Sequence, residues 1–388
     1  MRVLLTPHTG LRKIAAESNY LMFLDLAKHL ISKGHFCYMV MPRYAQDQVE
    51  RIPGLMYVYK DYEYDWYTEY GLVNLREMAD LFSRVVGKYF IDVLVTAMSL
   101  QVPLYQLCLS DMYHQRDIPC IVVDPAVMYY KPQNPIGKMS HWLHCMGYAN
   151  STAVFLSPYE KTVALDNCKH FLLPSEVKKV AETSLVLPVG VNCEEIDKIT
   201  TGLPKFDKFT LFFGGRLNTS KKPERIFELY GKFFSAGHDV QVKMTTNTSE
   251  TKFSTYHAGF DMYSKYKDAI DIQYRVPRDE YWKIAAQSHV GIAWSDEEGF
   301  PVGFWEQMYI GLPVLFPKKP WALSQLPDWY PWVFKDKQEA YSMLLYIKEN
   351  YDKVVEEMAP MRDFIRENYS SGIIYTVLEN KMLELTQQ

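Results

Sequence analysis

The sequence contains no Cys-x-x-Cys pair, no long hydrophobic run and no large excess of charge of one sign. Its six cysteines are scattered along 388 residues, which argues against a disulfide framework or a zinc site and favours a reducing compartment. No stretch approaches the roughly 18 uninterrupted apolar residues of a membrane span, and the first residues lack the apolar region of a signal peptide. These absences predict a soluble, cytoplasmic protein.

The charge and aromatic content restrict the partners. A net charge of −4 creates no field that would hold a polyanion, so contact with nucleic acid would need a local basic patch. The aromatic content of 15% is high and indicates stacking surfaces as well as cores. No Asp-x-Asp triplet is present, which argues against an enzyme that holds its leaving diphosphate through a divalent cation.

Short apolar runs alternate with amphipathic segments, a pattern typical of an α/β protein with parallel sheets. The chain length predicts two domains. In the first half we expect a helix at 19–33 and strands at 2–6, 36–41, 92–97, 120–123 and 153–156. In the second half we expect strands at 209–213, 240–244, 270–274, 290–293 and 313–316, and helices at 222–236, 302–309 and 351–385.

The polar stretch 200–208 is typical of a linker between two such domains. We therefore predict a first Rossmann-like domain at 1–195 and a second at 205–369. Two aromatic segments of the first domain, 57–70 and 128–138, are expected to be loops, the former a surface loop or lid. Their rings offer stacking faces for a sugar or a nucleobase.

The first candidate site is a glycine turn between an expected strand and a helix, FGGRLNTSKK at 213–222. Glycines allow a close approach of the backbone to a ligand. Arg216 and Lys221 then follow at a helix entrance, where cations and amides can bind a diphosphate. The alternative is a glycine turn with two solvated cations. The segment lacks the pattern of a Walker loop.

The second candidate site is an acidic, glycine-containing loop that leads into a helix, SDEEGFPVGFWE at 295–306. Glu298 and Glu306 lie eight residues apart, so one is placed at the helix entrance and the other inside the helix. A carboxylate there can accept hydrogen bonds from vicinal hydroxyls such as those of ribose. Alternatively, Glu298 is an exposed acid that the helix dipole favours.

Together these segments resemble the retaining glycosyltransferases of family 4, whose G-R-L-x-x-x-K and E-x7-E stretches frame the donor site. GLPV at 311–314 and PVGVN at 188–192 are similar to further motifs of that family. The resemblance implies a GT-B fold, in which two Rossmann-like domains face each other across a cleft. It also implies that the tail 370–388 crosses back to the first domain.

The resemblance implies a role for each matching residue. Gly215, Arg216 and Lys221 would bind the diphosphate of a UDP- or GDP-sugar. Glu306 would hold the ribose, and Glu298 would face the transferred sugar. The sugar or distal phosphate would be contacted by the backbone of Phe300, Pro301, Val302 and Gly303. The base would be contacted by the backbone of Tyr274, Arg275 and Val276.

The sequence departs from the family pattern in three places. Pro301 stands where the family has glycine, which removes one N–H from the phosphate loop. MTTN at 244–247 replaces a glycine-rich strand end, and Gly10 stands alone where a glycine pair is usual. These departures concern the identity of the donor more than its class.

The acceptor side offers three further candidates. Asp124 follows an apolar run where the family often places a residue facing the sugar, but it is equally a turn residue before Pro125. His8, after the first strand, could act in catalysis or serve only in packing. His141 and His144 lie on one expected helix, but a metal site would need a third ligand.

The leading interpretation is a metal-independent, retaining glycosyltransferase that needs no cofactor besides its nucleotide-sugar co-substrate. Its acceptor would be a glycan, a lipid or a small molecule. One alternative is a phage-type enzyme that glycosylates modified DNA bases. Others are a GT-B epimerase, a phosphorylase (for which no pyridoxal-phosphate lysine is evident) and a non-catalytic GT-B binding module.

Overall fold

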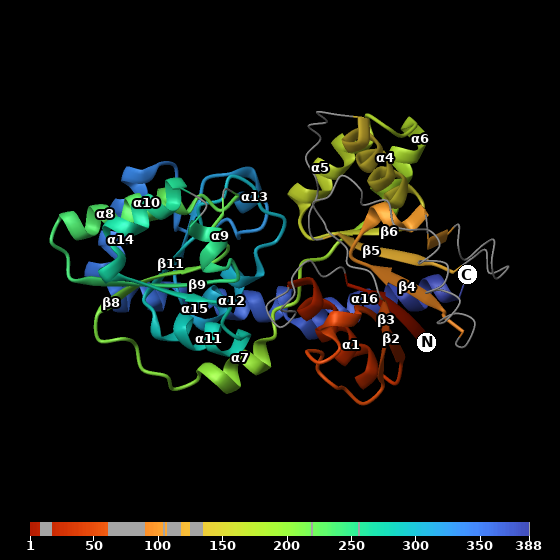
Figure 1. Ribbon diagram of the computed structural model, residues 1–388, viewed down its shortest axis with the longest axis horizontal. Coiled ribbons are helices and arrows are strands. Elements are labelled where there is room, and N and C mark those ends of the chain that lie inside the picture. Colours follow the sequence, from red (N-terminus) through yellow and green to blue (C-terminus); the bar gives the residue numbers. More distant parts are fainter. Residues whose placement is uncertain are drawn as a thin grey trace. The chain divides into compact units, whose positions relative to one another are not determined.

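The computed structural model describes residues 1–7, 18–60, 90–103, 105–106, 118–124, 135–218, 220–254 and 257–387. The chain divides into two compact units (Figure 1). The first unit consists of Met1–Val189 together with Ile374–Gln388, and the second of Gly190–Ile373. Each unit is built around one parallel sheet with helices on both faces, as predicted for two Rossmann-like domains.

The sheet of the first unit has seven strands in the order β3-β2-β1-β4-β5-β6-β7. Most of these strands are buried on both sides, which is typical of a parallel sheet between two layers of helices. The strands are β1 (Arg2–Thr6), β2 (Phe36–Pro42), β3 (Leu55–Lys60), β4 (Val93–Thr96), β5 (Cys120–Asp124), β6 (Thr152–Phe155) and β7 (Leu185–Val186).

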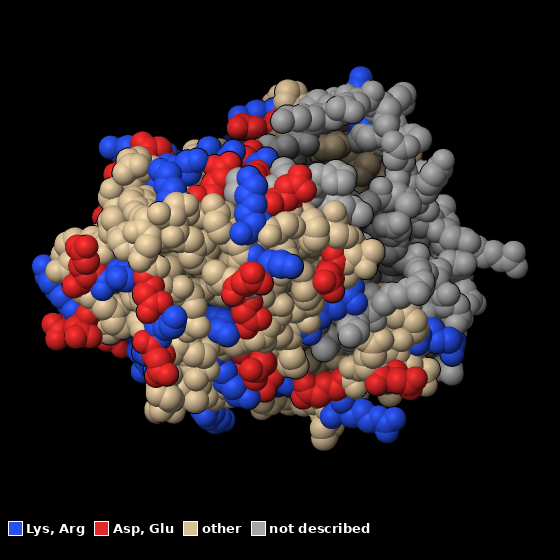
Figure 2. Space-filling model, turned by 60° about the vertical axis from the view of Figure 1, so that its left-hand side comes forward, with Lys and Arg blue, Asp and Glu red and all other residues tan. Residues whose placement is uncertain are grey.

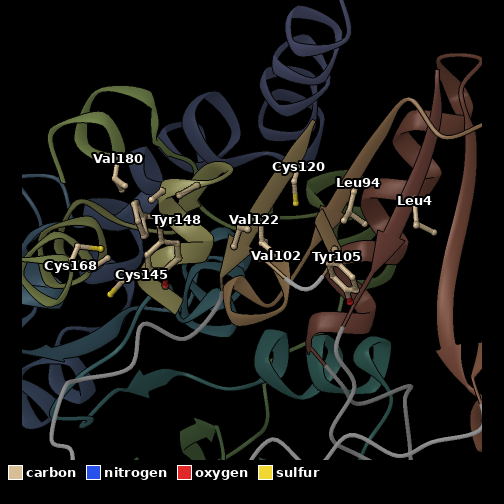
Figure 3. Close-up of a cluster of buried hydrophobic side chains, with 14 of the residues drawn as sticks. Leu4, Leu94, Val102, Tyr105, Cys120, Val122, Cys145, Tyr148, Cys168 and Val180 are labelled. Carbon is tan, nitrogen blue, oxygen red and sulfur yellow. The ribbon is translucent and has the colours of Figure 1, made fainter. Parts of the chain in front are cut away.

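Helices cover both faces of this sheet. One layer contains α4 (Pro135–Ala149), α5 (Pro158–Cys168) and α6 (Pro174–Thr183), and the other contains α1 (Ser18–Ser32) and α16 (Ser371–Thr386) (Figure 1). Figure 3 shows how side chains of α4 pack toward those of β4 and β5. The five cysteines of the described part of the chain are buried and free, and three of them, Cys120, Cys145 and Cys168, lie within this core.

The sheet of the second unit has six strands in the order β10-β9-β8-β11-β12-β13. Its strands are β8 (Phe209–Gly214), β9 (Val240–Thr246), β10 (Ile270–Tyr274), β11 (Val290–Ile292), β12 (Val314–Pro317) and β13 (Val333–Phe334). From β8 the chain adds β9 and β10 on one side and then returns to add β11 on the other. The strand order therefore reverses between β8 and β11, and this is the point at which open parallel sheets bind ligands.

Figure 1 shows helices of the second unit on both faces of its sheet. One layer contains α8 (Pro223–Ser235), α10 (His257–Lys265) and α14 (Lys337–Glu349). The other contains α7 (Cys193–Thr200), α11 (Arg278–Gln287), α12 (Val302–Ile310) and α15 (Tyr351–Tyr369). The short helices α9 (Glu250–Ser254) and α13 (Pro320–Leu323) complete the unit. None of the helices in the described ranges is both long and apolar enough to span a membrane.

Several details differ from the predictions. Residues 57–60 of the predicted lid belong to strand β3, and residues 135–138 of the predicted 128–138 loop belong to α4. The rest of both loops lies outside the described residues. The helical tail is interrupted at Ser370, which has an extended backbone between α15 and α16. The first unit ends at Val189 rather than at 195, because α7 packs against α11 and α12 of the second unit.

Candidate active site

The two candidate segments follow neighbouring strands of the second sheet. Strand β8 pairs with β11 through Val290 opposite Leu211 and Gly291 opposite Phe212. The loop after β8 leads into α8, and the loop after β11 leads into α12. Because both loops leave the carboxyl ends of adjacent parallel strands at the reversal of strand order, they form the natural ligand-binding edge of this sheet.

The glycine turn after β8 is closely packed. A Cβ atom added to Gly214 would lie 2.5 Å from Cε2 of Tyr281, and one added to Gly215 would lie 2.8 Å from Cζ of Phe213. Neither site has room for a side chain. The loop ends at Lys222, whose left-handed backbone (φ 51°) precedes Pro223, the first residue of α8. The glycines therefore allow the backbone to pass close to α11 while it enters the next helix.

A direct contact joins the two segments. The ammonium of Lys221 donates a hydrogen bond to Oε1 of Glu298. The two side chains are only 14% and 12% exposed, so this ion pair is screened less than a surface pair. Arg216 lies on the same loop as Lys221 and is exposed. Lys221 is thus paired with the acidic loop, whereas Arg216 is accessible from solvent.

Asp296 forms a second set of contacts between the two loops, and this residue was not predicted from the sequence. Its Oδ1 accepts a hydrogen bond of 2.9 Å from Arg225, and the ammonium groups of Lys222 and Lys319 lie 3.8 and 3.7 Å from its carboxylate. Partial burial raises the pKa of Asp296, but Arg225 and the two lysines outweigh burial and bring it below its ordinary value. The carboxylate of Asp296 therefore faces three cations.

Aromatic packing supports the start of α12. Phe300 is stacked on Trp305 with ring centres 5.4 Å apart and planes 1° apart, and the amide of Gln325 donates to the Gly299 carbonyl at 2.7 Å. Pro301 occupies the N-cap position and provides no N–H. The Val302 amide is bonded to the Phe300 carbonyl at 2.9 Å. Of the residues at 300–303, whose backbone the family resemblance assigned to the sugar or distal phosphate, Pro301 thus has no N–H to donate and Val302 already uses its own within the chain.

Glu306 lies inside α12 with a side chain only 5% exposed. Its Oε1 accepts hydrogen bonds from both Nη2 and Nε of Arg278, at 2.9 and 3.2 Å. The Arg278 guanidinium also lies 4.8 Å from the ring centre of Trp282. Arg278 was not predicted, because nothing in the sequence relates a residue at the start of α11 to one that follows 28 positions later.

Tyr281 connects the glycine turn to α12. Its hydroxyl donates to the Gly303 carbonyl at 2.6 Å and accepts from the Gln307 amide at 3.0 Å, while its ring packs against Gly214. Burial, with a further contribution from Glu306, raises the pKa of Tyr281 well above its ordinary value. The phenol therefore remains neutral and can keep donating its proton to the α12 backbone.

The segment predicted to contact the base leads into α11. Tyr274 ends β10, Arg275 has a left-handed backbone (φ 55°), and the Arg275 amide donates to the Thr246 carbonyl at 2.6 Å. Burial raises the pKa of Tyr274 to about 12. After Val276 and Pro277 the chain reaches Arg278, so this segment is only a few residues from the Arg278–Glu306 pair.

The acceptor-side candidates belong to the first unit. Asp124 is the last residue of β5 and is paired in register with Phe155, but its side chain lies outside the described residues, as does all of His8. The ring Nδ1 of His144 is hydrogen-bonded to the Ser99 hydroxyl at 2.5 Å within the core. Within the described ranges no three His, Cys, Asp or Glu side chains are grouped as metal ligands would be. His144 is buried in the first unit.

Solved structures with the same architecture match over almost the whole chain. Anabaena HepE in complex with UDP and glucose superposes with a TM-score of 0.72 at 12% identity, covering 99% of this chain and 100% of HepE. The corresponding TM-score is 0.76 for sucrose-phosphate synthase from Thermosynechococcus elongatus, at 12% identity and 99% coverage of both chains. The trehalose-6-phosphate synthase OtsA gives 0.71 at 13% identity, covering 98% of this chain and 99% of OtsA.

The chain has the GT-B fold. The predicted fold class is therefore confirmed. No family model and no curated protein matches the sequence. Every residue predicted to bind the donor belongs to the second unit of this GT-B fold. The structure brings Lys221 and Glu298 into contact and pairs Glu306 with a residue that was not predicted. The roles assigned to these residues stay predictions.

Proposed function

We propose that this protein is a glycosyltransferase that takes a sugar from a nucleotide-diphosphate donor bound by its second unit. The contact between Lys221 and Glu298 is the main support, because it joins the cationic loop to the acidic loop at the reversal point of the sheet. A diphosphate needs cations, and a transferred sugar needs hydrogen-bond acceptors. This edge of the sheet offers both within one pair of loops.

In the proposed reaction, the bond between the anomeric carbon and the diphosphate oxygen breaks. The oxygen of an acceptor hydroxyl forms the new glycosidic bond, and the proton of that hydroxyl passes to the departing diphosphate. Arg216 and Lys221 stabilise the negative charge that develops on the departing diphosphate, with help from the start of α12. Glu298 faces the transferred sugar and stabilises the positive charge at the anomeric carbon. Two cations and a helix dipole would supply the neutralisation that a metal ion supplies elsewhere, so we propose a metal-independent reaction. Retention of configuration is proposed from the family resemblance alone.

We propose a UDP-sugar as the donor and a GDP-sugar as the second choice. HepE, one of the proteins that shares this fold, was solved with UDP-glucose. The acceptor would be a hydroxyl of a glycan, a lipid or a small molecule. Figure 2 shows basic and acidic side chains interspersed across the described part of one face, without a continuous basic band there. Since DNA binding depends on neutralising several phosphates at once, that distribution favours an uncharged acceptor over modified DNA.

Calorimetry with UDP and GDP would test the donor, and mass spectrometry of products from a panel of nucleotide sugars and acceptors would test the reaction. We expect UDP to bind and one UDP-sugar to be consumed with formation of a glycosylated product. Binding of UDP without turnover on any acceptor would support the non-catalytic binding module instead. The absence of binding by both nucleotides would refute the proposed function.

A further inference from the structure

The pair formed by Arg278 and Glu306 has an asymmetric geometry. Both guanidinium donors, Nη2 and Nε, are directed at the same carboxylate oxygen, Oε1, at 2.9 and 3.2 Å. The other oxygen, Oε2, accepts no hydrogen bond from the part of the chain that the structure describes. A carboxylate that is 95% buried needs a partner, because removing its charge from water is costly. Arg278 provides this partner and uses only one of the two oxygens.

The position of Arg278 in its helix argues against a role in stabilising α11. Arg278 is the first residue of α11, where the helix dipole disfavours a cation. Its guanidinium carbon lies 4.8 Å from the centre of the Trp282 ring, within the range of a cation–π contact. This contact and the two hydrogen bonds to Oε1 of Glu306 restrict the orientation of the guanidinium, and a lysine could not reproduce its two donors.

We propose that Arg278 is a positioning residue that turns Glu306 so that Oε2 accepts hydrogen bonds from the ribose hydroxyls of the donor. Arg278 would thereby determine the preference for ribonucleotide over deoxyribonucleotide donors without touching the ribose itself. This inference rests on the proposed function, because it takes Glu306 as the residue that holds the donor ribose.

The test compares the affinities of the full chain for UDP, 2′-deoxy-UDP and 3′-deoxy-UDP by calorimetry. We expect the unaltered chain to bind UDP at least about tenfold more tightly than it binds at least one of the two deoxy nucleotides, because without that hydroxyl the buried carboxylate loses a partner. In Arg278→Met, the affinity for UDP should fall to within about twofold of the affinity of the same variant for that deoxy nucleotide. Arg278→Lys should recover only part of the discrimination. Lys283→Met, which removes an exposed cation of the same helix, should leave the ratio unchanged.

A purely structural role of Arg278 predicts a different result. Its loss would then weaken the binding of UDP and of both deoxy forms by the same factor, and that outcome would overturn the inference. Equal affinity of the unaltered chain for all three nucleotides would overturn it as well, although donor binding would stand. If Arg278→Met does not fold, the double variant Arg278→Met with Glu306→Gln removes the unpaired buried charge and should bind all three equally. Failure of the unaltered chain to bind UDP or GDP would instead reject the proposed function.

Discussion

The ammonium of Lys221 is hydrogen-bonded to the carboxylate of Glu298, a residue 77 positions further along the chain. In the proposed reaction the lysine binds the departing diphosphate and the glutamate faces the transferred sugar. The donor must therefore compete with Glu298 for Lys221, or share the lysine with it. Each partner keeps the other charge-balanced in a part of the loop where both side chains are largely buried.

Neutralising Glu298 and neutralising Glu306 should change the kinetics of the enzyme in different ways. Glu298→Gln should lower kcat without lowering the affinity for UDP, because it removes a charge that acts at the anomeric carbon and also competes for Lys221. Glu306→Gln should raise the KM for the donor more than it lowers kcat, since a ribose contact is much the same in ground state and transition state. Steady-state kinetics of both variants would show this, and turnover within about twofold of the parent for both would contradict it.

Arg216→Ala should weaken the binding of the nucleotide by about 1.5–3 kcal/mol, because it removes a charge-assisted contact to the diphosphate. Arg216 is exposed, so the free energy of unfolding should change by less than about 0.5 kcal/mol. Calorimetry with UDP measures the first effect and urea unfolding the second. Lys208→Ala, which breaks an exposed pair with Asp239 in the same unit, is the matched control. Unchanged affinity in Arg216→Ala would remove this residue from the donor site.

Much of the fold could be predicted because the buried strands of a parallel sheet are continuous apolar runs. The missed strands lie at sheet edges or are very short. Strand β3 pairs only with β2 and carries Tyr and Lys, and β7 and β13 contain two residues each. Their hydrophobic signal is too weak to separate them from loops.

The site could be predicted only in part, for a related reason. Local motifs identified Arg216, Lys221, Glu298 and Glu306, because each follows a strand and precedes or enters a helix. The pairs that organise the site join residues far apart in sequence, such as Arg278 with Glu306 and Arg225 with Asp296. Such contacts depend on tertiary packing, and local sequence periodicity does not predict them.

Activity should persist in excess EDTA. The prediction follows from the cationic side chains of the donor loop, which would neutralise the departing diphosphate themselves. Product formation would be measured with and without the chelator at equal ionic strength, because screening also weakens these contacts. Complete loss of turnover that magnesium restores would reject the metal-independent mechanism.

Tyr281→Phe should destabilise the second unit by about 1–3 kcal/mol, because the part-buried Gly303 carbonyl and the buried Gln307 amide each lose a hydrogen bond. The ring that packs against Gly214 would remain, so the glycine turn should be retained. Urea unfolding followed by tryptophan fluorescence suits this measurement, since six of the eight tryptophans belong to 190–373. Tyr346→Phe, on an exposed ring of α14, should have little effect. Equal stability of Tyr281→Phe and the parent would show that the hydroxyl contributes nothing.

His289 should make the stability of the second unit depend on pH. Burial, assisted by nearby Lys205, lowers the pKa of His289 from 6.5 to about 4. The Thr210 amide donates to its Nδ1 at 3.1 Å, so protonation of that nitrogen would break the hydrogen bond. Between these two pKa values the unfolded chain binds a proton that the folded chain does not, and the free energy of unfolding therefore falls as the pH is lowered through this window. His289→Gln has no such proton, so its disadvantage relative to the parent at about pH 7.5 should shrink at about pH 5 in urea unfolding experiments. A difference between the two proteins that is independent of pH would contradict the assignment of a depressed pKa to His289.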